Sequence, residues 1–240
     1  MKPSPRDLQA QQALDALNLS PYPTGDSVSE LTPERAVRVA LAWHLGRIEA
    51  RVEGQSSPLR PRYVGDEWAR GTEPAVYPSL TVLGRSTRPM DVQFGVPFRL
   101  DGRDLISADE TWALWHQGED VGDGLVHIFA AHKPQRDALA HAVQDALGGN
   151  LDTLQSLGLA LPEAALPLVF QGVLPVAQLP RCRVALAGPS TPVDDALAAS
   201  GGAWRADVPF TWQAPRLAAR RRIPDLRSEV AVSVAAPSEA

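Results

Sequence analysis

The sequence has a single cysteine, Cys182, which excludes an internal disulfide and any zinc site built from several cysteines. It also lacks an uninterrupted apolar run of about 18 residues, the length of a membrane-spanning helix, so no membrane contact is expected. The first five residues lead into a polar segment, which argues against a signal peptide. A net charge of −5 argues against general nucleic-acid binding, although it leaves room for a local basic patch.

Motifs of catalysis are missing as well. The chain contains no Gly-x-Ser-x-Gly motif, no phosphate-binding loop and no dinucleotide fingerprint. The glycines within residues 118–124 come closest, but they stand beside Glu119, Asp120 and Asp123, and these carboxylates would repel a phosphate. We therefore expect neither enzymatic activity nor a cofactor.

The remaining composition is typical of a folded protein. Of the 240 residues, 44% are apolar and 21% are charged, and a chain of this length can bury a substantial core. The 22 prolines and 18 glycines predict short and often interrupted elements. We interpret residues 1–240 as one domain with a helical arm over residues 1–30 and a proline-rich insertion over residues 151–202.

Three segments have the sequence pattern of helices. The clearest begins with Thr32 as its N-cap and is expected to end at Gly54. A second is expected from Pro134 to about Gly148, and a third within residues 4–17. The apolar residues of the clearest helix recur at steps of three or four and form one stripe: they are Val37, Leu41, Leu45, Ile48 and Val52.

The middle of the chain has the pattern of a β-hairpin. Residues 111–116 and 125–131 are apolar and aromatic, and the acidic, glycine-rich residues 117–124 between them suit a turn. With the helices, these strands predict an α+β fold, an antiparallel or mixed sheet flanked by two main helices, with long loops and extended arms. The other expected strands are residues 77–83, 90–94, 96–100, 168–174, 183–187, 203–212 and 228–234.

Histidines gather near the predicted hairpin. His116 and His127 would be near neighbours across it, with His132 close by, and three histidines with carboxylates could bind a metal. Their spacing matches no ligand signature such as His-Glu-x-x-His, and solvated polar residues explain them equally well. We predict no metal site, and we keep a metal-dependent hydrolase using His116, His127 and His132 as one alternative function and a monomeric adaptor domain as another.

Charge is distributed unevenly along the chain. Residues 101–124 hold seven acids and one base, whereas residues 216–227 hold five arginines and one acid. Each run can be a solvated face, but opposite patches on one chain also suit a ring contact between successive subunits. The candidate interface residues are Arg216, Arg220, Arg221, Arg222, Glu119, Asp120 and Asp123.

Residues 125–139, Leu-Val-His-Ile-Phe-Ala-Ala-His-Lys-Pro-Gln-Arg-Asp-Ala-Leu, continue through residues 142–147 as a strand, a polar junction and an amphipathic helix. The strand at residues 77–80, the helix at residues 32–52 and the return of strands near the C-terminus follow the same plan. This order of elements resembles bacteriophage tail-terminator and tail-completion (neck) proteins over about half of the chain.

The resemblance implies a structural protein of a tailed-phage virion rather than an enzyme. Such a protein forms a ring, usually hexameric, that terminates the tail tube and connects it to the neck. Its partners would be copies of itself, the tail tube and neck or connector proteins, with DNA only as passing cargo. It would be located in the tail or neck of the virion, and in the host cytoplasm during assembly.

Overall fold

The computed structural model describes residues 31–66, 77–90, 95–148, 156–193 and 203–222. The helices are α2 (Pro33–Leu45), α3 (Lys133–Ala146) and the short 3-10 helices η2 (Glu163–Ala165), η3 (Leu168–Phe170) and η4 (Val176–Gln178). The strands are β1 (Tyr63–Gly65), β2 (Ser79–Pro89), β3 (Val96–Pro97), β4 (Arg99–Leu100), β5 (Arg103–Asp104), β6 (Trp112–Ala130), β7 (Leu157–Ala160), β8 (Arg181–Leu186), β9 (Thr191–Val193) and β10 (Trp204–Arg221).

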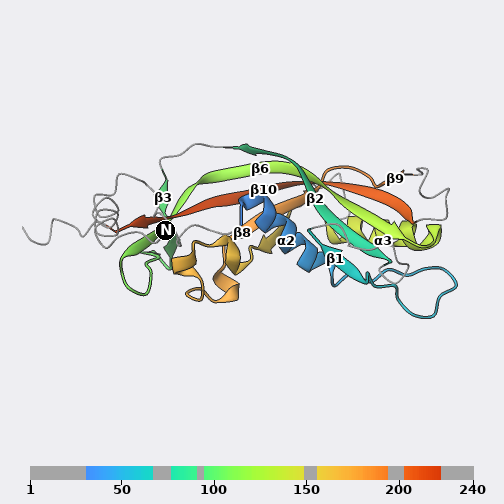
Figure 1. Ribbon diagram of the computed structural model, residues 1–240, viewed down its shortest axis with the longest axis horizontal. Coiled ribbons are helices and arrows are strands. Elements are labelled where there is room, and N and C mark those ends of the chain that lie inside the picture. Colours follow the sequence, from blue (N-terminus) through green and yellow to red (C-terminus); the bar gives the residue numbers. More distant parts are fainter. Residues whose placement is uncertain (1–30, 67–76, 91–94, 149–155, 194–202, 223–240) are drawn as a thin grey trace, which may run out of the picture.

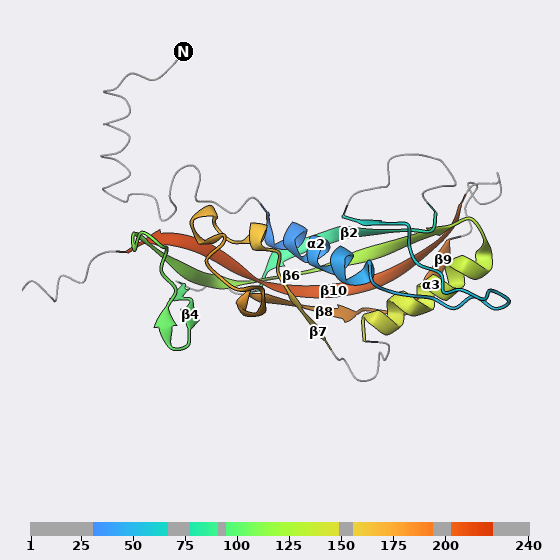
Figure 2. The same cartoon turned by 90° about the horizontal axis from the view of Figure 1, so that it is seen from below.

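Eight strands form one curled, mixed sheet, and both α-helices pack on the same face of it (Figures 1 and 2). The strand order is β1-β2-β6-β10-β8-β7, with β3 beside β6 and β9 beside β10. Among the described strands only β1 and β2 run parallel, and β4 and β5 form a separate two-stranded sheet. The α+β fold expected from the sequence is thus confirmed.

β6 and β10 are the dominant feature, because they pair along almost their whole length. β6 has 19 residues and β10 has 18, and their register runs from Trp204 opposite Ala130 to Arg221 opposite Trp112. One irregularity interrupts it, between Pro215 and Leu217. Strands in globular proteins usually have about 5–6 residues, so this pair forms an unusually long ribbon.

The hairpin predicted in the middle of the chain is wrong, since residues 117–124 lie inside β6. Two of the glycines that suggested a turn are instead positions of close packing. A Cβ atom on Gly122 would lie 2.6 Å from the ring of Trp212, and one on Gly124 would lie 2.4 Å from the ring of Phe210. Glycine inside a strand often marks such a close approach.

The C-terminal strand also differs from the prediction. It continues past residue 212 to Arg221, so Arg216, Arg220 and Arg221 lie within β10 and not in a loop between two strands. Pairing with β6 over this length supplies backbone hydrogen bonds that the local sequence does not reveal.

α2 begins as predicted but ends earlier. The Thr32 hydroxyl accepts a hydrogen bond from the Arg35 amide at 3.3 Å, and Gly46 rather than Gly54 forms the C-cap. Beyond the helix, Ala50 exchanges backbone hydrogen bonds with Leu59 at 2.8 and 2.9 Å. This pairing requires extended backbone where the apolar spacing suggested further helical turns.

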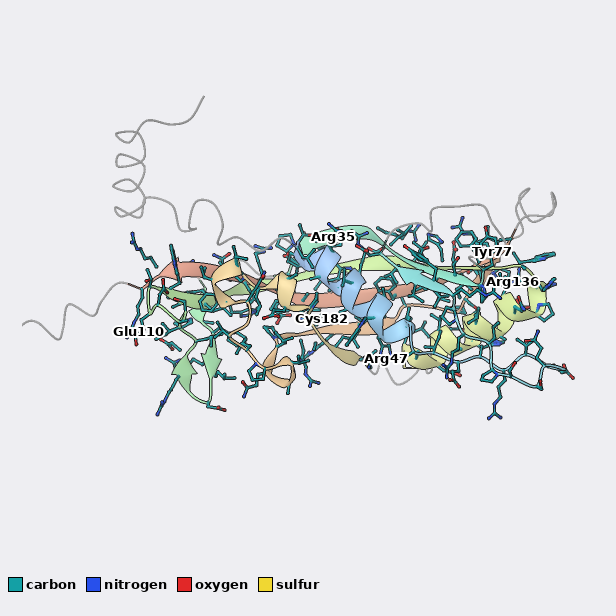
Figure 3. All side chains as sticks on the ribbon, turned by 60° about the horizontal axis from the view of Figure 1, so that its bottom comes forward. Arg35, Arg47, Tyr77, Glu110, Arg136 and Cys182 are labelled. Atoms are coloured by element: carbon teal, nitrogen blue, oxygen red, sulfur yellow. The ribbon has the colours of Figure 1, made fainter. Side chains whose placement is uncertain are left out.

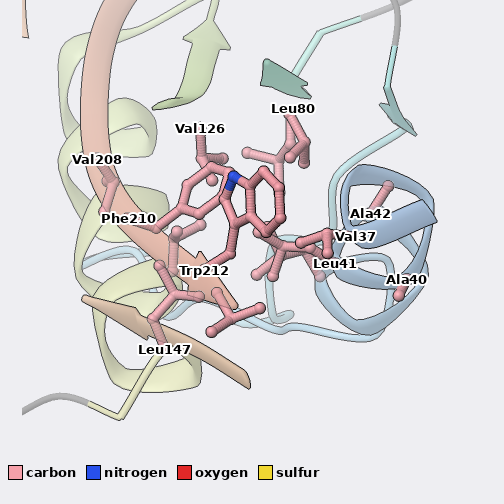
Figure 4. Packing of buried hydrophobic residues seen from close by; sticks show 14 of the residues in the cluster. Val37, Ala40, Leu41, Ala42, Leu80, Val126, Leu147, Val208, Phe210 and Trp212 are labelled. Carbon is pink, nitrogen blue, oxygen red and sulfur yellow. The ribbon is translucent and has the colours of Figure 1, made fainter. Parts of the chain in front are cut away.

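α3 agrees with its prediction. Its apolar face, including Leu139 and Val143, is buried, and Gly148 follows the helix with a left-handed φ of 108°. The main hydrophobic cluster lies between the two helices and the sheet, where Trp212 of β10 reaches toward α2 and Phe210 lies near Val126 (Figure 4). We call this cluster the body core.

A second, smaller cluster lies toward the other end of the ribbon, beneath the insertion. The predicted strand at residues 168–174 is instead η3 and a turn at Gly172, whose φ is 76°, whereas the strand predicted at residues 183–187 is present as β8. Proline before η3 favours such a short turn over a strand. We call this cluster the end core: Leu105, Leu114, Leu166, Phe170, Leu174, Leu179 and Ala219.

Two further strand predictions can be assessed. The strand expected at residues 77–83 is present as β2, and that at residues 96–100 is divided into β3 and β4. The predictions for residues 4–17 and 228–234, and that for residues 90–94 apart from Met90, lie outside the described residues. Within the described part of the chain, no helix combines the length and apolar character needed to cross a membrane.

Candidate functional site

The predicted acidic and basic segments lie side by side, because the register of the ribbon places them opposite each other. Pro215 pairs with Glu119 and Ala214 with Asp120. The Arg216 guanidinium donates to the nearly buried Asp120 carboxylate, next to the irregularity in β10. Two residues predicted to contact different subunits are therefore ion-pair partners within one chain.

The other acidic candidates also have partners in the same chain. The Ser86 hydroxyl donates to the Asp123 carboxylate from the neighbouring strand β2. Glu119 Oε1 lies 3.9 Å from His116 Nε2, a loose contact near the surface. These contacts leave the carboxylates partly accessible, so their role in an interface stays a prediction.

The three consecutive arginines line the far end of the ribbon. Arg220 stacks on Trp115 with its guanidinium carbon 4.7 Å from the ring centroid, and Arg221 stands over Trp112 at 5.9 Å. Arg222 Nη1 lies 3.8 Å from Glu110, which Figure 3 shows at the end of the molecule opposite Arg136. Arg221 and Arg222 are exposed, where a partner could reach them, whereas Arg220 is only partly exposed and its Nε is buried.

The histidines do not converge. His116 and His127 lie on the same strand, 11 residues apart, which corresponds to about 37 Å along β6, so the predicted contact between them is wrong. His132 is the exposed N-cap residue of α3. Among the described residues, no group of three or more His, Cys, Asp or Glu side chains is arranged to hold a metal ion.

One histidine takes part in a buried polar row that the sequence did not reveal. On the face of the sheet away from the helices, His127 stands between Thr81 of β2 and Asp207 of β10. His127 Nδ1 lies 2.6 Å from Asp207 Oδ1, and Arg205 donates to both oxygens of the same carboxylate at 2.8 Å. Arg205 Nη2 also lies 2.9 Å from His127 Nδ1, but an arginine nitrogen can only donate a hydrogen bond. Because the contact between Nδ1 and Asp207 is the shorter one, we place a proton on Nδ1, which donates to the Asp207 carboxylate.

The polar row lowers the pKa of Asp207. Burial acts to raise this pKa, but the hydrogen bonds from His127 and Arg205 and their charges outweigh it. Threonine, histidine and aspartate in this order could in principle form a nucleophile, a base and an orienting acid. Solvent reaches only 1% of Thr81 and 5% of His127, so the row as folded offers no room for a substrate.

The single thiol is also unsuited to chemistry. Cys182 is fully buried in the body core, and burial raises its pKa to about 12. A thiol with such a pKa is almost entirely protonated at neutral pH and is a poor nucleophile.

Two open grooves lie on the described surface. One, of about 640 Å³, crosses the face away from the helices and is lined by Arg88, Arg183 and Asp123 together with apolar residues such as Met90 and Val121. The other, of about 530 Å³, lies between α2 and the edge strand β1 and includes Trp43. The first combines charged and apolar side chains, and the second exposes a large aromatic ring.

Comparison with known proteins identifies no relative: no family model and no curated protein sequence matches this chain. The functional argument therefore depends on the residues and their geometry, together with the resemblance described above.

Proposed function

We propose that this chain is a structural protein of a tailed bacteriophage, which forms a ring that terminates the tail tube and connects it to the neck. The resemblance in the order of elements suggests this role, and the α+β fold with two helices on a sheet is compatible with it. Its partners would be other copies, the tail tube and neck or connector proteins, with DNA passing through as cargo. Its place would be the virion, after assembly in the host cytoplasm.

The observation that carries the proposal is the exposure of large apolar side chains on an elongated molecule (Figure 1). Exposed apolar groups that gather on a surface mark contacts with other proteins. In this protein such groups lie on α2, after the end of β2, on β3 and in the insertion, so more than one surface offers a contact to a neighbour. The histidines give the hydrolase alternative little support, because they lie far apart or are buried.

Mass and shape in solution test the proposal. Sedimentation velocity and negative-stain imaging of the full-length protein, alone and with purified tail tubes, are expected to show closed rings of several subunits. A strict monomer under all these conditions, at low and moderate salt, would instead favour the monomeric adaptor domain.

A further inference from the structure

A row of four side chains crosses the outer face of the sheet, which is the face away from the helices. The strand register places Arg88 of β2 opposite Val121 of β6. From Val121 the row continues to Gln213 of β10 and ends at Arg183 of β8. All four residues line the open hollow of about 640 Å³ described above, which we call the arginine groove.

Both ends of this row are basic and accessible. Arg88 and Arg183 are exposed, and no hydrogen bond or ion pair joins either guanidinium to another described residue. Asp123 is the one acid among the lining residues, and it lies in the next row, where it accepts a hydrogen bond from Ser86. The half-buried Val121 lies between the two arginines. The groove therefore offers two cations on either side of an apolar side chain.

The spacing of the two arginines fits an extended peptide that lies across the strands. Neighbouring strands are about 4.8 Å apart, so the three steps from Arg88 to Arg183 amount to about 14 Å. An extended peptide rises about 3.4 Å per residue, and every second side chain points to the same side, so its residues i and i+4 are also about 14 Å apart. Because arginine binds carboxylates through paired hydrogen bonds, the groove suits an acid, an apolar residue and a second acid at alternate positions.

The sequence contains this pattern at two places. One is Glu119, Val121 and Asp123, which lie in β6 and belong to the groove itself. The other is Asp26, Val28 and Glu30. In the remaining pairs of acids four residues apart, the middle residue is arginine or threonine. Residues 7–30 hold four acids and no base, so this segment, which lies outside the described residues, has the charge opposite to that of the two arginines.

The start of α2 decides which copy can supply the segment. Leu31 packs against the body core, on the helix side of the sheet. Consecutive α-carbons are about 3.8 Å apart, so Glu30 of the same chain stays on that side, whereas the arginine groove lies on the opposite face. An occupant from residues 26–30 therefore comes from another copy.

We propose that residues 26–30 of one copy lie extended across the arginine groove of a second copy. Asp26 and Glu30 each pair with one of the two arginines, and Val28 covers the middle of the row. A contact between two different surfaces repeats from copy to copy and closes into a ring when the rotation allows it. This inference rests on the proposed ring function, for which it supplies a contact.

Charge reversal on each side tests the pairing in the full-length protein. The groove variant carries Arg88→Glu with Arg183→Glu, and the arm variant carries Asp26→Arg with Glu30→Arg. Each variant alone is expected to lose assembly in sedimentation velocity where the wild type assembles, because like charges then meet. An equimolar mixture should assemble again, since each arm meets a groove of opposite charge on the other chain.

A matched control reverses two other acids of the same arm. Asp7→Arg with Asp15→Arg makes the same change in net charge outside residues 26–30 and should assemble like the wild type. Both arginines of the groove variant are exposed, so the fold should tolerate their replacement, and circular dichroism checks that each variant remains folded.

A peptide measures the contact without assembly. A labelled peptide of residues 24–31 should bind the full-length arm variant in fluorescence anisotropy, and salt should weaken the binding because it screens exposed ion pairs. Adding Arg88→Gln or Arg183→Gln to that protein should weaken binding about fivefold. A peptide of the same composition with its two acids adjacent should lose a similar factor, because it reaches only one arginine.

The outcomes separate this inference from the proposed function. Rings formed equally by the wild type and by the groove and arm variants would overturn the contact and leave the ring function in place. A mixture that stays dissociated, while one chain with all four changes assembles, would overturn the exchange between copies. Equal binding of the peptide with adjacent acids would also overturn the proposed pairing. A wild type that stays monomeric with and without tail tubes contradicts the ring function, and the peptide then decides the contact by itself.

Discussion

The body core and the end core share two strands but are built in different ways. The body core has 24 buried residues, contributed largely by the two α-helices and the sheet, whereas the end core has seven, several of them from 3-10 turns of the insertion. β6 and β10 run through both, and the ion pair between Arg216 and Asp120 lies where one gives way to the other. A small core with few regular elements opens locally at a lower free energy, so the end of the ribbon should be the less stable part.

The same substitution in each core tests this difference with the largest effect. Phe210 and Phe170 are both fully buried. Phe210→Ala is expected to lower the free energy of unfolding by about 3–5 kcal/mol. Phe170→Ala should cost no more than about 2 kcal/mol globally, because the end core can open without unfolding the body. Urea unfolding measures both values, and limited proteolysis should detect the opened end in Phe170→Ala. Equal losses in the two variants would show that the cores unfold as one unit.

The ion pair between the cores should produce the next largest effect. Asp120→Ala removes the nearly buried carboxylate that pairs with the Arg216 guanidinium. Because the Arg216 side chain is about one third exposed, water offsets part of the lost ion-pair energy. We expect a cost of about 2–3 kcal/mol by urea unfolding. Glu110→Ala, which removes a looser and exposed partner of Arg222, is the control and should cost less than about 1 kcal/mol. The prediction fails if the two variants are equally stable.

Lowering the pH should destabilise the body core more than the end core. Burial acts to raise the pKa of Asp207, but the hydrogen bonds and charges of His127 and Arg205 outweigh burial, so this pKa is lowered overall. The carboxylate therefore stabilises the fold above its unfolded pKa of about 3.9, and this stabilisation is lost as the pH falls through the lower folded value. Asp207→Asn should cost about 1–2 kcal/mol at neutral pH and flatten the acid limb of stability.

A second carboxylate near the end core provides the comparison for this titration. The pKa of Asp109 is also lowered, first by the Ser107 hydroxyl and then by Thr111, but Asp109 is exposed to solvent. The fall in urea midpoint from pH 6 to pH 3 should therefore stay close to that of the wild type in Asp109→Asn and be clearly smaller in Asp207→Asn. An acid limb that Asp207→Asn leaves unaltered would contradict the role of the buried row.

The smallest effect on the fold is expected from the three consecutive arginines at the end of β10. Replacing Arg220, Arg221 and Arg222 together by Ser removes two cation–π contacts and a loose ion pair, for a total of about 1 kcal/mol. The same variant should weaken the ring or its docking to the tail. Circular dichroism melting measures the fold, and sedimentation or virion complementation measures assembly. Arg60→Ser, which removes an exposed ion pair with Glu49, is the control. Normal assembly of the triple variant would show that the three arginines are solvated and do not contribute to an interface.

Elements stabilised by neighbours in the chain could be predicted from the sequence. Thr32 caps α2 and Pro134 lies in the first turn of α3, as the local patterns indicate. Where distant residues decide the backbone, the predictions failed. Gly122 and Gly124 suggested a turn, yet they allow the aromatic rings of β10 to pack against β6. The end of α2 was predicted too late in the chain for a similar reason, because the pairing of Ala50 with Leu59 requires extended backbone after Leu45.

The candidate site was predictable only in its residues. The sequence singled out Asp120 and Arg216 as opposite charges, but their contact depends on the register of strands that lie 96 residues apart in the chain at this point. The row at His127 left no sequence signal at all, because its partner Asp207 is 80 residues away. The exposure of Trp43 and Val176 could not be predicted from the sequence either, because apolar residues are expected to be buried.

By itself, then, the sequence determined the start and the apolar faces of the helices, the presence of strands and the absence of common catalytic motifs, because capping, periodicity and residue chemistry act over a few neighbouring positions. Tertiary structure alone decided that β6 and β10 form one long ribbon, that the acidic and basic runs lie opposite each other along it, and which apolar side chains remain exposed. Those outcomes depend on pairings between segments about 80 to 100 residues apart, and strand pairing leaves only an alternation of side chains in each partner.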